Sequence, residues 1–371
     1  MRTFLLAVAA ASALVSSDAV RAADPPERLP TSVRVLLFSG GPSREYQFCR
    51  RVFVQETERM KAVLSICLQV TDPLGLRIQD VPAERFHPKF PDSLDNFDVI
   101  VAVDPDWNQL SAEQLAKVNE WVTKQGGGLI FIAAPVNTFN LSQAVKAEKL
   151  QPIRDLLPVE PDDSRSAKAA ERSTRIPWRI QFHKEAEKAA PFLKLDPEAK
   201  DPFAGWAEFL LIERHIARER KVDHERIAKL ILDLDAKEFE KRDKASKELG
   251  EVGWPAIPAL EKALKEKPSL EVATRLDLIT SSIKWDVDLG RGFHTFYPVK
   301  KVKPAATLLA SFGDPAAAMP NGELHPYLAT MPAGKGKVVW LGSGEMWRLR
   351  THREAFHDRF WVELAQWVRS K

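Results

Sequence analysis

The sequence predicts an α/β protein in which helices cover both faces of a mostly parallel sheet. Short apolar runs alternate with segments of helical spacing through the first half of the chain. A strongly charged, helix-patterned stretch between residues 212 and 289 interrupts this alternation. The strand pattern then resumes and ends in one amphipathic helix. Strands in this order, joined by helical crossovers, form a sheet that is buried on both sides.

The first half is expected to contain four strands and two helices. Gly40, Gly41, Pro42 and Ser43 separate the first strand from the first helix. Ser111 and Gln114 form a capping pair at the start of the second helix, and three glycines follow it. The expected strands span 33–38, 62–70, 97–103 and 129–132, and the helices span 44–60 and 111–125.

The charged stretch 212–289 is expected to form three or four short helices inserted into the α/β domain, which itself spans 32–211 and 290–371. Its pattern resembles a HEAT-type helical repeat, in the segments 233–239, 242–245, 249–250, 255–260 and 267–271. There is one clear copy, whereas repeat arrays need about three to bury a continuous core. The apolar face of this insertion therefore docks on the α/β domain or on a partner.

The strand pattern after the insertion completes the sheet. Short strands are expected at 293–299, 306–310, 327–330 and 337–342, and the last helix at about 352–370. A turn at 332–336 separates the last two strands.

The amino end has the composition of a secretory signal. One arginine is followed by an apolar run of residues 4–15 and by small residues at 20–22. We therefore expect a signal peptide at 1–22, a flexible linker at 23–31, and an exported protein, periplasmic or extracellular, with an envelope protein as partner. If the signal stays uncleaved, it would retain the protein at the membrane. After cleavage no transmembrane span is expected.

Composition argues against a nucleic-acid partner, because 54 basic and 51 acidic residues are interleaved and the formal net charge is +3. Two cysteines cannot build a disulfide framework. Cys49 and Cys67 are either two buried thiols, which we favour, or a pair.

Four segments carry a family resemblance: LLFSGGPSREYQF at 36–48, QGGGLIFIAAP at 125–135, PVKKVKPAATLL at 298–309 and GKVVWLGSGEMWRLRTHREAFHDRF at 336–360. Together they resemble the class I glutamine amidotransferase-like domain, a flavodoxin-like fold, of exported bacterial proteins. The resemblance implies a nucleophilic Cys on the turn after strand 129–132, and a His with a Glu after a late strand. Ala133 or Ala134 stands at the first place, and 343–347 contains no His. His352 and His357 fall on the terminal helix, where we expect surface or capping roles.

The missing Cys and His argue against a glutaminase, and the sequence assigns no catalytic residue, metal or cofactor. Ligands of open α/β sheets bind outside the carboxyl ends of the strands. The residues expected there are the ligand-binding candidates Gly40, Gly41, Ser43, Arg44, Asp104, Asp106, Asn137, Glu345, Trp347 and Arg348.

Each candidate also has a structural interpretation. Gly40 and Gly41 either bind an anion or allow a tight turn that Ser43 caps. Asp104 and Asp106 either carry acid/base or metal chemistry or form turns. Glu345 and Arg348 bind a polar ligand or pair with each other or with Arg44, while Trp347 packs or stacks on a ligand.

Two functions remain open. The first is a noncatalytic module that binds a partner protein or small polar ligand at the sheet edge and through the insertion. The second is a non-thiol hydrolase or carbohydrate-active enzyme of the sugar-utilisation branch of amidotransferase-like folds, using Asp104, Glu345 and Arg348. An enzyme requires a deep pocket in which such side chains converge. A shallow, arginine-paired edge together with an exposed apolar face on the insertion favours the module.

Overall fold

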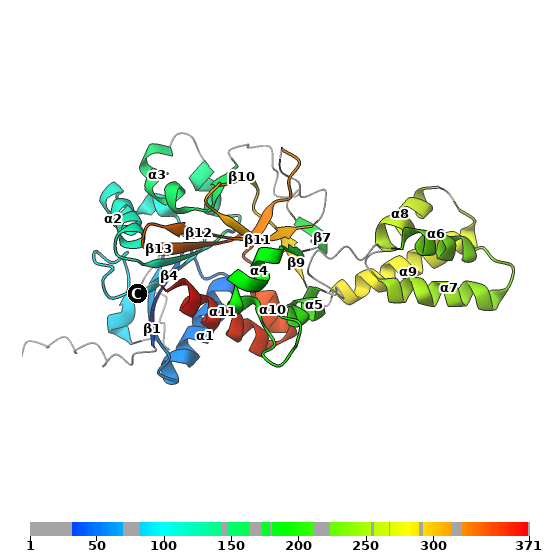
Figure 1. Ribbon diagram of the computed structural model, residues 1–371, viewed down its shortest axis with the longest axis horizontal. Helices are drawn as coiled ribbons and strands as arrows, with labels where there is room; N and C mark the ends of the chain where they lie inside the picture. The colour runs from blue at the N-terminus through cyan, green and yellow to red at the C-terminus, as the bar shows by residue number, and fades with distance from the viewer. Residues whose placement is uncertain are drawn as a thin grey trace, which may run out of the picture.

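A computed structural model describes residues 32–69, 82–142, 147–162, 173–178, 180–210, 223–253, 256–266, 268–288, 292–313, 319 and 321–369. These residues form a mixed α/β structure with a large central sheet flanked by helices (Figure 1), so the predicted fold class is confirmed. The predicted signal peptide and linker lie outside the described residues.

The central sheet has nine strands in the order β3-β2-β1-β4-β5-β13-β12-β11-β8. The strands from β3 to β13 are parallel, and β12, β11 and β8 continue the sheet in antiparallel fashion. Their bounds are β1 Val33–Ser39, β2 Ala62–Leu68, β3 Phe86–His87, β4 Val99–Val103, β5 Gly128–Ile132, β8 Ile180–Phe182, β11 Thr307–Phe312, β12 Pro326–Ala333 and β13 Gly336–Leu341.

Each face of the sheet has its own apolar core, because neighbouring strand residues point to opposite sides. Val35 and Leu37 of β1 join the core under α1 and α11, whereas Leu36 and Phe38 join the core under α2 and α3. The helices on the first face are α1 Arg44–Glu58, α4 Lys184–Ala189, α5 Ala204–Leu210, α10 Trp347–His352 and α11 Glu354–Val368; those on the second are α2 Ala112–Thr123 and α3 Ala147–Leu156. This double burial explains why the strands are apolar along their whole length.

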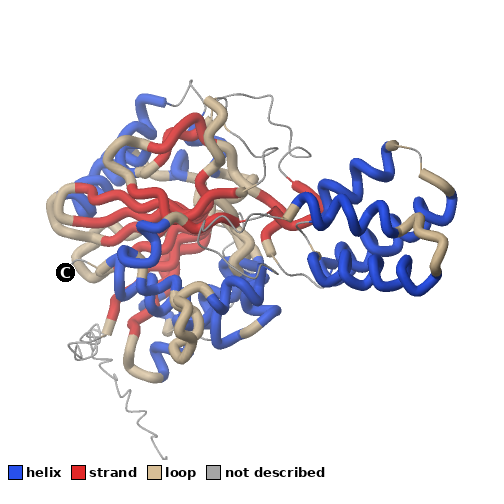
Figure 2. The backbone as a smooth tube through the Cα atoms, turned by 45° about the vertical axis from the view of Figure 1, so that its right-hand side comes forward, coloured by secondary structure: helices blue, strands red, loops and turns tan. Residues whose placement is uncertain are grey.

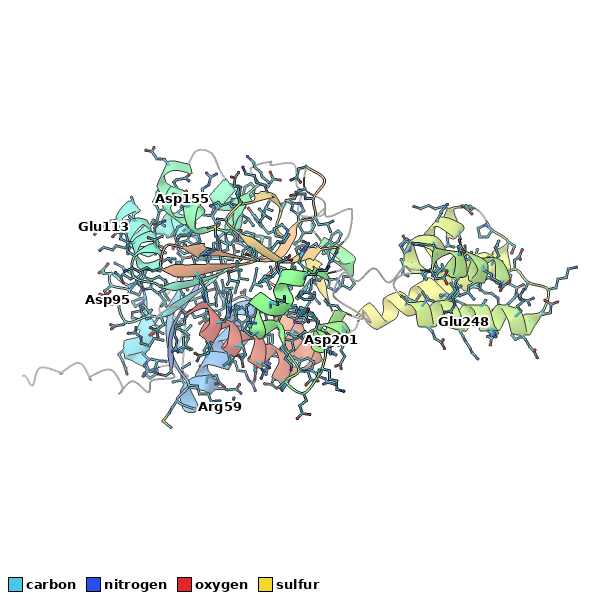
Figure 3. The ribbon with its side chains drawn as sticks, in the orientation of Figure 1. Arg59, Asp95, Glu113, Asp155, Asp201 and Glu248 are labelled. Carbon is cyan, nitrogen blue, oxygen red and sulfur yellow. The ribbon has the colours of Figure 1, made fainter. Side chains whose placement is uncertain are left out.

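The inserted segment forms a separate helical lobe beside the sheet (Figures 1 and 2). It contains α6 His224–Asp233, α7 Phe239–Val252, α8 Ile257–Lys265 and α9 Leu270–Asp288. Leu234, Leu249, Leu260 and Leu276 are buried in a third core that shares no residue with the other two. The main apolar stripes of the lobe are therefore used inside it. Figure 3 shows side chains filling both units, with Glu248 on the lobe.

Several elements were not predicted. Two small antiparallel pairs, β10–β6 and β7–β9, flank the main sheet. The last helix, predicted at about 352–370, is present as α11, whereas the short helix α10 before it was not predicted. His357 is fully buried in α11, so its expected surface or capping role is wrong. The strands of the two pairs are β6 Val159–Pro161, β7 Ser173–Trp178, β9 Phe293–Thr295 and β10 Val299–Val302, and single 3-10 turns lie at Ala83–Arg85, Trp107–Gln109, Thr138–Ser142 and Pro191–Leu193.

Candidate site at the carboxyl edge of the sheet

Four parallel strands end in one row, which brings the predicted site residues into neighbouring turns. Ser39 pairs with Val103, Val103 pairs with Ile132, and Ile132 pairs with Leu341. The turns at 40–43, 104–106, 133–137 and 342–346 follow these four residues directly. The strands β2 and β4 lie on opposite sides of β1, so this edge includes the point where the strand order reverses, the usual ligand position in such sheets.

The Asp104 carboxylate stabilises the loop after β5. Its carboxylate accepts hydrogen bonds from the backbone N–H groups of Val136 and Asn137 at 3.1 Å and of Thr138 at 2.6 Å, and from the Thr138 hydroxyl at 2.6 Å. Burial raises the pKa of Asp104 to about 6, against the opposing effect of these hydrogen bonds. The carboxylate serves the protein's own backbone, so the turn-forming interpretation is the one the contacts support.

Asp106 and Asn137 are also held by the protein. Asp106 caps the 3-10 turn at 107–109, and its Oδ1 accepts hydrogen bonds from Asn108 at 3.0 and 3.1 Å and from the Asn140 side chain at 3.2 Å. The Asn137 amide donates to the Asp104 backbone oxygen at 2.8 Å. Within the described residues, no three His, Cys, Asp or Glu side chains are grouped as metal ligands.

The turn after β1 has the geometry of a tight strand-to-helix connection. A side chain on Gly40 would place its Cβ only 2.3 Å from the Asn137 amide nitrogen and the Asp104 oxygen, whereas Gly41 has nothing within 4 Å of that position. The Ser43 hydroxyl accepts a hydrogen bond from the Tyr46 N–H at 3.2 Å and so caps α1. Gly40 is therefore required for close packing.

The turn that would carry a nucleophile packs against the turn after β13. Ala133 donates its N–H to Leu341 at 2.8 Å. A Cβ built on Gly344 would lie 3.1 Å from the Ala134 Cβ and 3.5 Å from the Ala133 oxygen. The two turns that the resemblance pairs as nucleophile and acid/base are thus neighbours, in contact through a methyl group and a glycine.

Glu345 attaches the returning chain to this edge. Its Oε2 accepts the backbone N–H groups of His294 at 2.6 Å and Thr295 at 2.8 Å, and its Oε1 pairs with the Arg348 Nε at 3.1 Å. Trp178 fixes the same segment by donating its ring N–H to the His294 oxygen at 3.1 Å. The expected pairing of Glu345 with Arg348 is present, and the carboxylate also holds β9.

Two arginines stack on Trp347 at the outer side of this cluster. The guanidinium carbons of Arg44 and Arg348 lie 4.7 and 4.6 Å from the centre of the Trp347 ring. Arg44 is exposed, while Trp347 and Arg348 are half-buried. The outer side of the cluster is thus lined by two guanidinium groups stacked on one indole ring.

Glu45, beside Arg44, was not among the predicted site residues. It is buried at the start of α1, and its Oε2 accepts the Trp347 N–H at 3.2 Å. Burial raises the pKa of Glu45 to about 8, with a smaller contribution from nearby Glu345, so the carboxyl is largely protonated at neutral pH. An acid in the first turn of a helix ordinarily complements the helix dipole. Glu45 is buried because α1 packs against residues 345–347, and this packing could not be predicted from the sequence.

The two cysteines are separate buried thiols, as favoured from the sequence. Cys49 lies in the core on one face of the sheet and Cys67 in the core on the other. Burial raises the pKa of Cys67 to about 12 and that of Cys49 well above its usual value. Neither thiol is prepared to act as a nucleophile.

Two surface hollows lie away from the row of strand ends. One, of about 280 Å³, lies between the α4 region and α11 and is lined in part by Phe203 and Arg359. The other, of about 470 Å³, runs along α1 beyond Arg44 and is lined in part by Gln47, Phe48 and Arg51.

No family model matches the chain, and no curated protein matches it. Two solved structures are similar to it. The cytoplasmic protein STM1381 from Salmonella typhimurium LT2 is 11% identical, with a TM-score of 0.40 over 91% of this chain and 99% of that one. The cytoplasmic protein STM3548 from Salmonella typhimurium is 12% identical, with a TM-score of 0.42 over the same shares.

The predicted export is corrected by this comparison. Both solved structures are named as cytoplasmic proteins, which contradicts a periplasmic or extracellular location. The prediction rested only on the composition of residues 1–22, which lie outside the described residues. We withdraw it together with the envelope partner. Among the described helices, none has an apolar stretch long enough to cross a bilayer.

Proposed function

We propose that this protein is a noncatalytic binding module of amidotransferase-like architecture. It would hold a partner protein or small polar ligand at the carboxyl edge of its sheet and through its helical lobe. One observation carries the proposal: the turn after β5 presents Ala133 and Ala134, and it packs against Gly344 at the place where chemistry would need a reactive group and open space.

The alternative, a non-thiol hydrolase or carbohydrate-active enzyme, is less well supported. It requires Asp104, Glu345 and Arg348 to converge on one open point. The Asp104 carboxylate is bound to the loop 136–138, and the Glu345 carboxylate is bound to β9 and to Arg348. The two carboxylates therefore bind different parts of the fold and do not converge. Neither of the two hollows lies at the row of strand ends.

The helical lobe supports a binding role because it exposes large apolar side chains. Leu232, Phe239, Leu270 and Leu278 are 63–86% exposed, and they are most of the large apolar residues exposed in the described parts of the chain. Leu270 and Leu278 lie two turns apart on α9, on the side of the helix that faces away from the lobe's core. Of the four, Leu270 and Leu278 share one side of a single helix, and the proposal places the partner on these two side chains.

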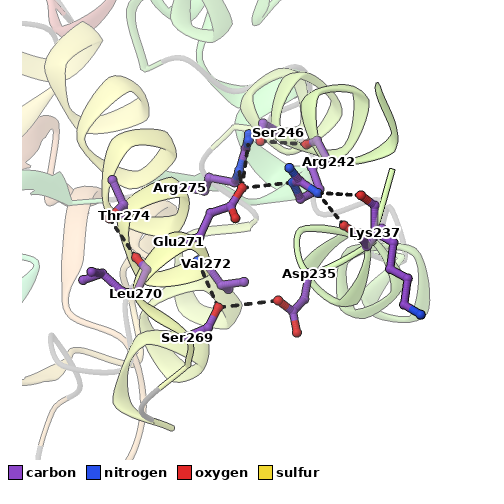
Figure 4. A network of polar contacts seen from close by, with 11 residues as sticks. Asp235, Lys237, Arg242, Ser246, Ser269, Leu270, Glu271, Val272, Thr274 and Arg275 are labelled. Carbon is purple, nitrogen blue, oxygen red and sulfur yellow. Dashed lines mark hydrogen bonds and ion pairs between the residues drawn. The ribbon is translucent and has the colours of Figure 1, made fainter. Parts of the chain in front are cut away.

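Polar contacts next to these residues make the surface rigid. Glu271 pairs with Arg242 at 3.0 Å and with Arg275 at 3.3 Å (Figure 4). Both guanidinium groups also lie over the Phe239 ring, at 5.7 and 5.6 Å. Ser269 accepts the Val272 N–H and so caps α9. Rigid arginine and aromatic groups are enriched where proteins bind each other.

Affinity capture from the protein's native cells tests the proposal. A partner should be recovered by the wild-type protein and lost from the L270S/L278S variant, because both leucines are exposed and their replacement leaves the lobe's core intact. Met60→Ser, at an exposed apolar residue of the α/β unit, is the matched control and should retain the partner. The interaction is then repeated with the purified partner.

Catalytic activity of the purified protein would contradict the proposed binding function. Turnover of glutamine, a glycoside or an ester by the purified protein, abolished by Glu345→Gln without loss of folding, would replace the binding module by an enzyme.

A further inference from the structure

The surface formed by α1 and α10 is rich in arginine. The first two turns of α1 contain Arg44, Arg50 and Arg51, and α10 adds Arg348 and Arg350. Arg44, Gln47 and Arg51 are three, four and seven residues apart, so they share one face of α1, and all three are exposed. Arg44 and Arg51 therefore stand about 10 Å apart along the helix axis.

Contacts between the helices join these arginines into one surface. The Arg44 guanidinium lies over the Trp347 ring of α10 at 4.7 Å, and the Arg350 guanidinium lies over the Phe48 ring of α1 at 4.8 Å. Arg51 approaches Glu354, the first residue of α11, at 3.7 Å. The aromatic rings thus position Arg44 and Arg350, while Arg51 has only the approach to Glu354.

The ion pairs within this surface show which of its arginines can bind further carboxylates. Arg348 pairs with the Glu345 carboxylate, and Arg350 pairs with that of Glu354. Arg44 makes no ion pair with the described residues, and Arg51 reaches only the carboxylate that Arg350 already engages. Two exposed guanidinium groups on one helix face thus retain the capacity to bind further carboxylates.

The α1–α10 surface has more arginines than carboxylates: Arg44, Arg50, Arg51, Arg348 and Arg350 lie near Glu345 and Glu354. Glu45 is the one acidic residue in 44–51, and burial keeps its carboxyl largely protonated at neutral pH. The hollow along α1 adds the amides of Gln47 and Gln55, which donate hydrogen bonds to oxygen acceptors; Glu58 lines its end farthest along α1 from Arg44, so a ligand's carboxylates are expected at the Arg51 end. Its volume of about 470 Å³ accommodates several residues of an extended chain.

We propose that the α1–α10 surface docks an acidic peptide segment of a partner protein, with Arg44 and Arg51 binding its carboxylates; this rests on the proposed binding function and names the partner's chemistry. A peptide fits better than a nucleic acid. The cationic groups cover only two helices, and the chain as a whole is nearly balanced, with 54 basic against 51 acidic residues. Binding to a phosphate backbone generally uses an extended basic face.

The test uses a short fluorescein-labelled oligo-glutamate peptide and fluorescence anisotropy with the full-length protein. The wild-type protein should bind this peptide, bind the matching oligo-glutamine peptide far more weakly, and lose affinity as salt rises from about 20 to about 300 mM. The R44E/R51E variant should bind at least about tenfold more weakly, because two attractive contacts become repulsive. Thermal unfolding confirms that this variant is folded.

The matched control is K89E/K335E, which changes the charge equally at exposed residues outside this surface and should bind like the wild type. Unchanged binding by R44E/R51E would overturn the proposal. Equal binding of an oligothymidylate of the same length would also overturn it, since the surface would then accept any polyanion.

Failure here is distinguishable from failure of the proposed function. If oligo-glutamate does not bind but the partner captured through Leu270 and Leu278 does, the acidic peptide is rejected and the binding module stands. If the purified protein shows turnover that Glu345→Gln abolishes, the proposed binding function is rejected, whether or not oligo-glutamate binds.

Discussion

Gly40 is the residue on which the turn between β1 and α1 depends. A Cβ at this position would overlap the Asn137 amide and the Asp104 backbone, both at 2.3 Å, and the loop after β5 would have to move. Gly41, the next residue, has open space around it. The pair therefore separates the effect of close packing from that of losing a glycine.

We expect Gly40→Ala to destabilise the protein by about 2–3 kcal/mol, as other overpacked sites do. This corresponds to a fall in Tm of roughly 3–5 °C for a chain of this length. Gly41→Ala should stay within about 1 °C of the wild type, since the new methyl group meets nothing. Differential scanning calorimetry of the three proteins measures the shifts, and equal Tm values for the two variants would refute the close-packing role.

Glu45 makes stability depend on pH. Its pKa rises on folding from 4.5 to about 8, so the folded protein keeps a proton that the unfolded chain releases. The stability associated with this carboxyl is complete below pH 4.5 and is lost as pH rises through about 8. The slope is at most about 1.4 kcal/mol per pH unit within this window.

Glu45→Gln removes the titration and keeps an oxygen that can accept the Trp347 N–H. We expect the variant to gain stability relative to the wild type as pH rises from about 5 to about 9. Asp104, whose pKa burial also raises, is present in both proteins and cancels in the difference. Thermal denaturation from about pH 5 to about pH 9 measures the difference in stability between the two proteins. A difference that does not change with pH would contradict a buried protonated Glu45.

At the scale of elements, the sequence predicted those that its own periodicity specifies. The strands near 33–38, 99–103 and 129–132 are continuous apolar runs, and the helix after Ser111 has both a capping box and an apolar stripe. The elements of 147–210 were not predicted, and most of them are short. The strands β6 and β8 have three residues and the helices α4 and α5 have six and seven, and such elements form only when tertiary contacts stabilise them. The longer α3 contains Pro152, a residue that argues against a helix in the sequence.

The separation of the short helix α10 from α11 has a tertiary cause as well. Arg353 has an extended backbone between α10 and α11, and His352 and Arg353 both reach Glu208 of α5, at 3.5 and 3.0 Å. The sequence pattern of 347–368 contains no glycine or proline that would mark this break.

The candidate site was predicted in position and only partly in its contacts. The strand ends placed the four turns correctly, since parallel strands share one carboxyl edge. Which atoms meet there depends on how α1 and β9 are oriented, and so Glu45 and His294 were missed. Glu345 holds β9, the strand that returns the chain from the helical lobe, so the root of the lobe belongs to the same cluster as the arginine-lined edge.

At the scale of the whole molecule, the three cores predict how the protein unfolds. The cores on the two sheet faces share the strands between them and should be lost together. The core of the lobe is built from α6–α9 alone (Figure 1). Local stability follows such divisions, because a unit with its own core can open without the rest.

Leu276→Ala should therefore destabilise the lobe selectively. Leu276 is fully buried in the lobe's core, and its truncation costs about 2–5 kcal/mol with the cavity that it leaves. Hydrogen exchange should accelerate in 224–288 and stay unchanged in β1 and β4. The matched variant Leu37→Ala removes an equally buried leucine from the sheet and should accelerate exchange in β1 and β4. Equal acceleration of the sheet by Leu276→Ala would mean that lobe and sheet form one cooperative unit, and that a partner bound to the lobe also stabilises the sheet.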